Sequence, residues 1–134
     1  MTVGGQASSV LLQPSLSQCV LGATSENTGN EPIALAFDPA GNLFVSDLMN
    51  NRVLKFPGAA TSNSNNMKAT SVFGQPDFTS NKKGSALNEL DFPVGLCFDA
   101  TRNILWVADT HNNRVLGFIM KDNTSSITLF LLLV

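Results

Sequence analysis

The sequence predicts an all-β protein built from two copies of one structural unit. Three observations support this prediction. One motif occurs twice, short β-branched and aromatic segments alternate with turn signals, and no segment has a convincing helical period. The hydrophobic content of 43% and the charged content of 13% are typical of a folded chain, and 134 residues are enough for one ordinary domain.

The internal repeat spans nearly the whole chain. DLMNNRVLKF at 47–56 returns as DTHNNRVLGF at 109–118, and SVLLQP at 9–14 returns as SVFGQP at 71–76, in each case 62 positions later. Between these segments, PIALAFDPAGN matches PVGLCFDATRN at an offset of 61. The chain is therefore divided into an N-terminal tail at 1–8, a first unit at 9–70 and a second unit at 71–134.

The first strand predicted in each unit is IALAF at 33–37 and VGLCF at 94–98. In both segments a Leu and a Phe alternate with small residues, so large side chains share one face and small ones share the other. Small residues suit close packing, which predicts a sheet covered on both sides. Cys97 is then expected to be a buried free thiol.

The other strands follow in order along each unit. NLFVS and ILWVA are expected as second strands, after turns such as DPAGN, and RVLKF and RVLGF as third strands. ATSVFG at 69–74 is a candidate fourth strand, and Trp106 is expected in the core. We expect 9–12 to be an outer strand of a preceding unit and 129–134 to be the outer strand of the second unit.

The repeated polar motif is interpreted as turn construction. Its Asp can accept backbone N–H bonds, its Asn residues tolerate left-handed geometry, and its Arg can reach the Asp of its own turn or of the next unit. A catalytic site seldom needs two identical copies. We assign a structural role to the following residues: Asp38, Asp47, Asn50, Asn51, Arg52, Asp99, Asp109, Asn112, Asn113 and Arg114.

Composition argues against several classes of protein. The net charge is −2 and the basic residues are scattered, so nucleic-acid binding is not favoured. Two cysteines and one histidine cannot supply a four-ligand zinc site, and no cofactor or catalytic metal is expected. No segment reaches the length of a membrane span. The N-terminus lacks the features of a signal peptide, which favours the cytoplasm without identifying a compartment.

These repeats resemble the NHL repeat family. PIALAFDPAGNLFVSDLMNNRVLKF and PVGLCFDATRNILWVADTHNNRVLGF both look like full copies, and VFGQPDFTS is similar to the element between long-period repeats of this family. The resemblance implies a β-propeller in which each repeat forms a four-stranded antiparallel blade. It also implies a platform that binds proteins, RNA or small ligands, with a ubiquitin-ligase motif in some members and a peptidyl-hydroxyglycine lyase in others.

The sequence departs from this family in two respects. Two repeats give an incomplete propeller, because closed propellers have about four to eight blades. The chain is therefore expected to be a fragment, or a piece that self-assembles to close the ring. No cluster of Cys and His residues resembles a RING domain, so the ligase role is not carried over.

The function favoured by the sequence is a non-catalytic NHL-repeat module that acts as a protein-binding scaffold, with loops carrying the contacts. One alternative is a fragment of a propeller enzyme of the lyase or lactonase type. The lyase needs several His and a Tyr, whereas this chain has one His and no Tyr. A lactonase would need carboxylates around Ca²⁺, for which Asp38, Asp47, Asp99 and Asp109 are less suited than for turns. The other alternative is an RNA-binding platform using Lys82, Lys83, Arg102 and Lys121.

Overall fold

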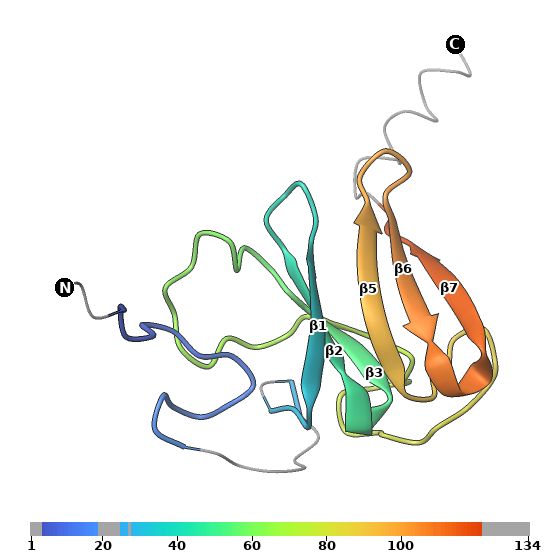
Figure 1. Cartoon of the computed structure of the whole chain (residues 1–134), viewed down its shortest axis with the longest axis horizontal. Coiled ribbons are helices and arrows are strands. Elements are labelled where there is room, and N and C mark those ends of the chain that lie inside the picture. Colours follow the sequence, from blue (N-terminus) through green and yellow to red (C-terminus); the bar gives the residue numbers. More distant parts are fainter. Residues whose placement is uncertain (1–3, 19–24, 27, 122–134) are drawn as a thin grey trace.

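The computed structural model describes residues 4–18, 25–26 and 28–121, which contain two antiparallel β-sheets packed face to face (Figure 1). The first sheet has the strand order β1 (Pro32–Phe37), β2 (Leu43–Asp47), β3 (Arg52–Phe56) and β4 (Ser71–Phe73). The second has the order β5 (Pro93–Asp99), β6 (Ile104–Asp109) and β7 (Arg114–Ile119). The all-β prediction is confirmed. In the described part of the chain, no helix is long and apolar enough to cross a membrane.

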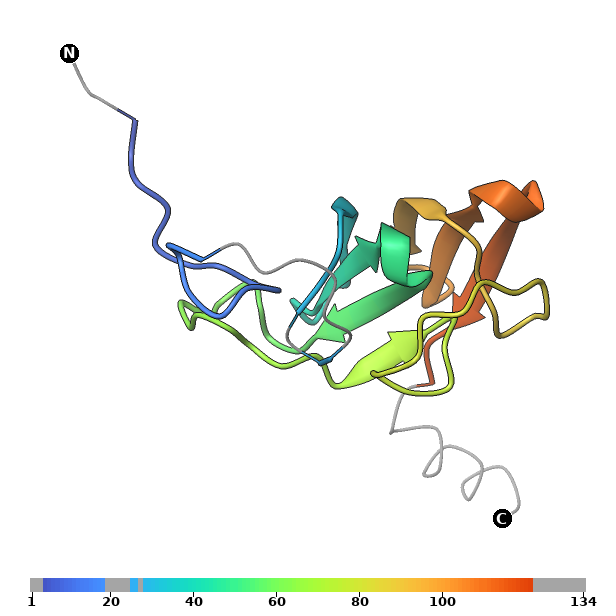
Figure 2. The same ribbon diagram turned by 90° about the horizontal axis from the view of Figure 1, so that it is seen from below.

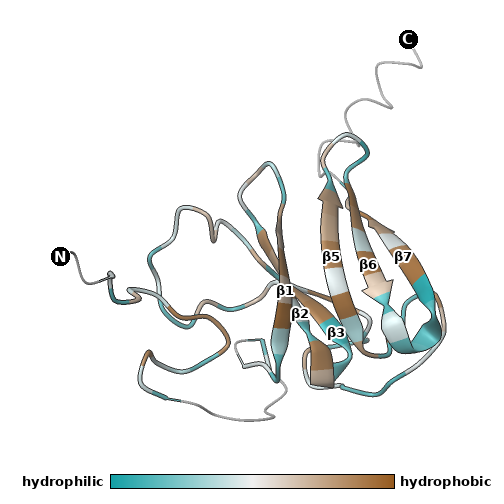
Figure 3. Ribbon diagram, viewed as in Figure 1, coloured by the Kyte–Doolittle hydropathy of each residue, from teal (hydrophilic) through white to brown (hydrophobic). Residues whose placement is uncertain are grey.

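Both sheets are meanders with the same register. In each sheet the second and third strands begin their pairing at the motif, with Asp47 opposite Arg52 and Asp109 opposite Arg114. One-turn 3₁₀ helices, η1 (Leu48–Asn50) and η2 (Thr110–Asn112), connect these strands. Apolar residues run along the strands, whereas polar residues gather at the turns (Figure 3). This is the pattern that period-2 alternation dictates for a packed sheet.

The two sheets pack face to face through an apolar cluster. Strand β5 of the second sheet contacts β1 and β2 of the first. The cluster contains five fully buried side chains: Phe44, Val53, Leu90, Leu105 and Val107. The rings of Phe44 and Phe98 stack across the interface, with centroids 5.5 Å apart and planes inclined by 19°. Viewed from below in Figure 2, the sheets lie next to each other as two layers.

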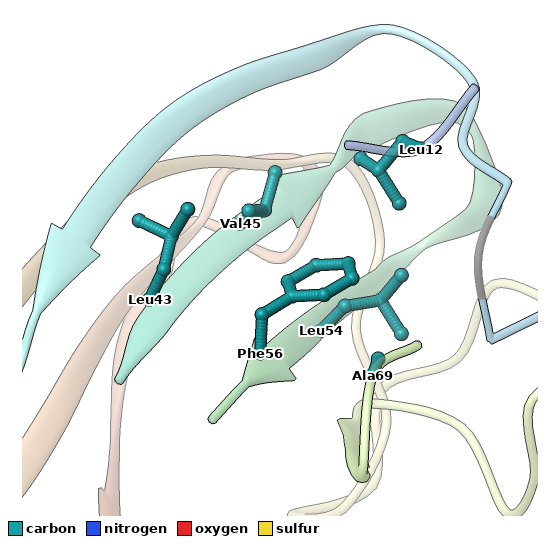
Figure 4. Close-up of a cluster of buried hydrophobic side chains, with 6 residues drawn as sticks. All are labelled: Leu12, Leu43, Val45, Leu54, Phe56 and Ala69. Atoms are coloured by element: carbon teal, nitrogen blue, oxygen red, sulfur yellow. The ribbon is translucent and has the colours of Figure 1, made fainter. Parts of the chain in front are cut away.

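A second apolar cluster covers the other face of the first sheet (Figure 4). Leu12 from the N-terminal segment and Ala69 from the connection before β4 pack on the side chains of β2 and β3: Leu43, Val45, Leu54 and Phe56. The prediction of an outer strand at 9–12 is wrong, because this segment adopts irregular structure. The segment lies on the face of the sheet rather than along an edge, because this position buries the Leu12 side chain against the apolar residues of β2 and β3.

The limits of the sheets differ from the limits of the sequence repeats. Strand β4 lies after residue 70 in sequence, yet it pairs with β3 and completes a four-stranded first sheet. It confirms the expected strand within 69–74. The second sheet has three strands in the described part of the chain, and the outer strand predicted at 129–134 lies outside the described residues.

Three expectations about burial are wrong. Leu35 is 63% exposed and Phe37 is 52% exposed, so strand β1 is covered on one side only. Cys97 is exposed, and Trp106 is half-buried on the outer face of the second sheet instead of lying in the core. The cause is the same in each case, since a strand pattern shows which residues share a face but not whether another element covers it.

Candidate functional site

The motif of the first sheet forms a buried ionic network. Arg52 Nε donates to Asp47 Oδ2 at 2.7 Å, and both side chains are fully buried. Asn50 Nδ2 donates to the same carboxylate oxygen at 2.9 Å, while Asp47 Oδ1 accepts the backbone N–H of Asn30 at 2.6 Å. The guanidinium also donates to the carbonyl oxygens of Phe78, Ser25 and Thr28 at 2.5 to 3.0 Å. The network therefore ties a hairpin to two separate loops, with the charges of Asp47 and Arg52 paired.

The motif of the second sheet repeats this arrangement closer to the surface. Arg114 Nε donates to Asp109 Oδ2 at 2.7 Å, and Asp109 Oδ1 accepts the backbone N–H of Asp91 at 2.7 Å. Asn112 Nδ2 donates to Asp109 Oδ2 at 2.9 Å and to the Gly84 carbonyl at 2.7 Å. The Arg114 side chain is 25% exposed. Its guanidinium donates to three carbonyl oxygens of the preceding loop, those of Ser85, Ala86 and Glu89.

The second Asn of each motif closes its turn in left-handed geometry. Asn51 has φ 51° and Asn113 has φ 52°, the region that Asn tolerates better than most residues. Asn51 also joins the two units, because its Oδ1 accepts the backbone N–H of Phe92 at 2.9 Å. Its Nδ2 donates to the Asn81 carbonyl at 3.0 Å. Sequence reasoning predicted the left-handed turn but had no signal for these contacts between units.

The remaining two motif residues lie at the opposite end of the sheets. Asp38 accepts the backbone N–H of Asn42 at 2.9 Å and its side-chain amide at 2.7 Å, which closes the turn between β1 and β2. Asp99 accepts the backbone N–H groups of Thr101 and Arg102 at 3.0 and 3.1 Å in the corresponding turn. The ten motif residues therefore form four separate turn networks. Among the described residues, no group of three His, Cys, Asp or Glu side chains is arranged to hold a metal ion.

The histidine of the second motif occupies a surface turn. His111 Nδ1 lies 3.3 Å from Asp91 Oδ1, and its side chain is 54% exposed. The imidazole stacks on the ring of Phe92 with centroids 4.3 Å apart. His111 is therefore an exposed residue of the turn between β6 and β7.

A cleft of about 410 Å³ opens between the sheets at the end that carries the Asp38 and Asp99 turns. The turns after β1 and β5 form its walls, together with Lys55 of β3 and the residues that follow β7. Its polar lining comprises Asp38, Asn42, Lys55, Thr101, Asn103 and Lys121. Lys55 and Thr101 belong to different units, so no local sequence signal joins them in one site. Only the packing of the sheets does so.

The chemistry of the cleft suits hydrogen bonding and anion contact. The Lys55 ammonium lies over the Phe44 ring, 5.7 Å from its centroid, in a cation–π contact. Lys121 is exposed at the rim. Asn42 donates to both oxygens of the Asp38 carboxylate, which remains an anion, so the cleft is lined by one carboxylate and two ammonium groups.

One four-stranded and one three-stranded antiparallel meander pack face to face and share the same register. This arrangement defines the fold class, because these are blades of a β-propeller. The model of the NHL repeat family matches residues 90–118, so this segment, from the end of the long loop to β7, is similar to an NHL repeat. The resemblance found in the sequence is thereby confirmed for the second unit. No curated protein matches the chain.

Proposed function

We propose that this chain is a non-catalytic interaction module that binds a protein partner at the cleft end of its two blades. The observation that carries the proposal is the cleft itself. Two turns and two lysines from different blades meet there around a hollow of about 410 Å³. Loops displayed on a rigid sheet scaffold are the usual location of binding residues. NHL propellers, by resemblance, act mostly as such platforms.

The state of the motif side chains supports a scaffolding role over a catalytic one. A general acid or base must reach a substrate proton, and a nucleophile must be accessible. The carboxylates of Asp47 and Asp109 are fully buried and already accept bonds from an Arg, an Asn and a backbone N–H. These groups are used to hold the blades and their loops together.

The charge of the cleft indicates the chemistry of the partner. Lys55 and Lys121 place two cationic groups at its wall and rim, and the amide side chains of Asn42 and Asn103 line the same space. A peptide segment that carries a carboxylate would pair with the ammonium groups and hydrogen-bond with the amides. We therefore expect an acidic loop or tail of a protein partner to occupy the cleft.

The test compares two variants that change charge equally at opposite ends of the molecule. Lys55→Glu with Lys121→Glu alters the cleft, whereas Lys82→Glu with Lys83→Glu alters the exposed loop before β5. Proteins crosslinked to the wild-type chain in cells are quantified for each variant, and the strongest is purified for calorimetry. We expect the cleft variant alone to lose binding, by roughly tenfold or more.

Equal recovery by the wild-type chain and the cleft variant would refute this proposal. If RNA is recovered instead, and the Lys82/Lys83 variant loses it with a steep salt dependence, the RNA-binding alternative is favoured. The two outcomes are separable because only the RNA-binding alternative predicts a loss of binding when Lys82 and Lys83 are replaced, with the cleft left unchanged.

A further inference from the structure

The outer face of the second blade carries a shallow apolar groove of about 250 Å³. It is lined by Gly95, Leu96, Cys97, Trp106, Ala108 and Val115. Val115 is 64% exposed, and Ile119 on the same strand is 71% exposed. A Cβ on Gly117 would lie 2.8 Å from Trp106 Cζ3, so glycine at this position leaves room for the indole against β7.

The corresponding face of the first blade is already covered. Phe44 occupies the position of Trp106, and Val53 occupies that of Val115; both are fully buried. They are buried because the second blade packs on them. Phe98 of β5 stacks on Phe44, and β5 as a whole contacts β1 and β2. The contact between the two blades therefore shows how a face of this kind is covered by the next blade.

The face that does the covering occurs twice in the chain. On the second blade it presents Leu96, Phe98, Leu105, Val107, Leu116 and Phe118 toward the first blade. The first blade has the same residue type at each matching position: Leu35, Phe37, Leu43, Val45, Leu54 and Phe56. Four of the six are covered by Leu12 and Ala69, but Leu35 and Phe37 are 63% and 52% exposed. These two match the β5 residues that lie against the first blade.

We propose that the outer face of the second blade binds β1 of a second copy of this chain. Phe37 of the second copy would stack on Trp106 as Phe98 stacks on Phe44, continuing the established contact between the blades into the next molecule. The contact joins two different surfaces, so it is heterologous and can repeat around a ring. Each added copy would extend the stack of blades in the direction in which a propeller closes.

The residues on both surfaces suit such a contact. The position of Lys55 in the first blade is taken by Gly117 in the second, so the groove lacks that charge. Ser46 donates to the Pro93 carbonyl between the blades, and its counterpart is Ala108. The contact between copies would therefore depend on apolar burial and on the Phe37–Trp106 stack.

The experiment follows the mass of the full chain by sedimentation over a wide concentration range, together with tryptophan emission. Trp106 is the one tryptophan, so its emission reports directly on the groove. We expect discrete association with a blue shift of the emission. Val115→Glu on the groove and Leu35→Glu on β1 should each weaken association more than tenfold, because each places a charge in a desolvated contact. Leu87→Glu is the control, since Leu87 is 82% exposed on the loop before β5.

Mixing the two variants tests the orientation of the contact. The Leu35→Glu chain keeps its groove and the Val115→Glu chain keeps its β1, so an equimolar mixture should form a dimer that grows no further. A monomer at every concentration would overturn the proposal. So would association that Leu35→Glu leaves unchanged, or a mixture that forms no dimer.

Discussion

The two copies of the motif make the same hydrogen bonds but lie at different depths in the molecule. Arg52 is fully buried, whereas Arg114 is 25% exposed, although the Nε to Oδ2 distance is 2.7 Å in both. Arg52 reaches carbonyls on both sides of its hairpin, at Ser25 and Thr28 before it and Phe78 after it. Arg114 reaches only the preceding loop among the described residues.

This difference shows that the turn and its environment have separate origins. The conformation of the turn is determined by its own residues, because the Asp, Asn and Arg of the motif contact one another and lie within a few positions in sequence. The depth is set by neighbours, since loops on both sides of the hairpin contact Arg52, whereas Arg114 contacts only the preceding loop among the described residues. The same ion pair should therefore contribute differently to stability in the two blades.

The largest expected effect comes from removing each arginine in turn. Arg52→Ala removes the only cation paired with the buried Asp47 carboxylate among the described residues, so we expect a loss of about 3–5 kcal/mol in the free energy of unfolding. Arg114→Ala should cost less, about 1–3 kcal/mol, because water can reach the groups that the side chain leaves. Urea unfolding followed by circular dichroism measures both values.

Arg102→Ala provides the control for this pair. Arg102 is 71% exposed and lies 3.5 Å from Asp99, so its removal should change stability by less than about 0.5 kcal/mol. Equal losses for Arg52→Ala and Arg114→Ala would show that burial does not distinguish the two networks.

A second prediction concerns a leucine that the two units place differently. Leu12 at φ 62° packs on Gly29 in the first unit, whereas Gly74 at φ 88° packs on Leu90 in the second. Leu12→Gly relieves the left-handed strain but loses a buried side chain, for a net cost of about 1–3 kcal/mol. Adding Gly29→Leu imitates the second unit and should recover at least about 1 kcal/mol through coupling.

The measurement is a double-mutant cycle by urea unfolding. Gly29→Leu alone should destabilise the chain, because its Cβ would already lie 2.8 Å from Leu12 Cδ1. Additive effects of the two changes would contradict the proposed exchange of volume between these positions.

A smaller effect is expected at the bond between the blades. Ser46 Oγ donates to the Pro93 carbonyl in a buried site, and Ser46→Ala should cost about 1–2 kcal/mol by leaving that carbonyl unpaired. The mirror change, Ala108→Ser on the outer face of the second blade, should stay within about 0.5 kcal/mol in the monomer. Thermal unfolding at low protein concentration compares the two, and a larger loss for Ala108→Ser would contradict the assignment of the covered face.

The smallest effect concerns a carboxylate that only the second unit has. Hydrogen bonds from the Thr79 hydroxyl, then from Ser80, lower the pKa of Asp77 from 3.8 to about 2. Since the folded pKa is lowered, its contribution is present above pH 3.8 and is lost as the pH falls toward 2. The matching residue of the first unit is Ser15, which does not titrate in this range.

Carboxyl chemical shifts followed by NMR across this range should place the Asp77 midpoint near the lowered value. Asp77→Asn should abolish the titration and leave the blades unchanged. A midpoint at the ordinary value would show that the turn around Thr79 does not form in solution.

By itself, the sequence determined the all-β class, the duplicated unit and left-handed geometry within the paired Asn residues, which the structure locates at Asn51 and Asn113. It could do so because these features depend on residues close together in the chain. It also identified the Asp47–Arg52 and Asp109–Arg114 partners, although the choice between the same turn and the next unit was left open. The structure resolves that choice in favour of the same turn.

Only the tertiary structure decided which faces are covered and where a cleft opens. The pattern at 33–37 placed Leu35 and Phe37 on one face but could not show that this face is free, nor that Trp106 lies on an open groove. Lys55 and Thr101 come from different blades and meet only through packing. The physical reason is that burial depends on contacts between distant segments, and a strand pattern is the same whether its apolar face meets another blade or water.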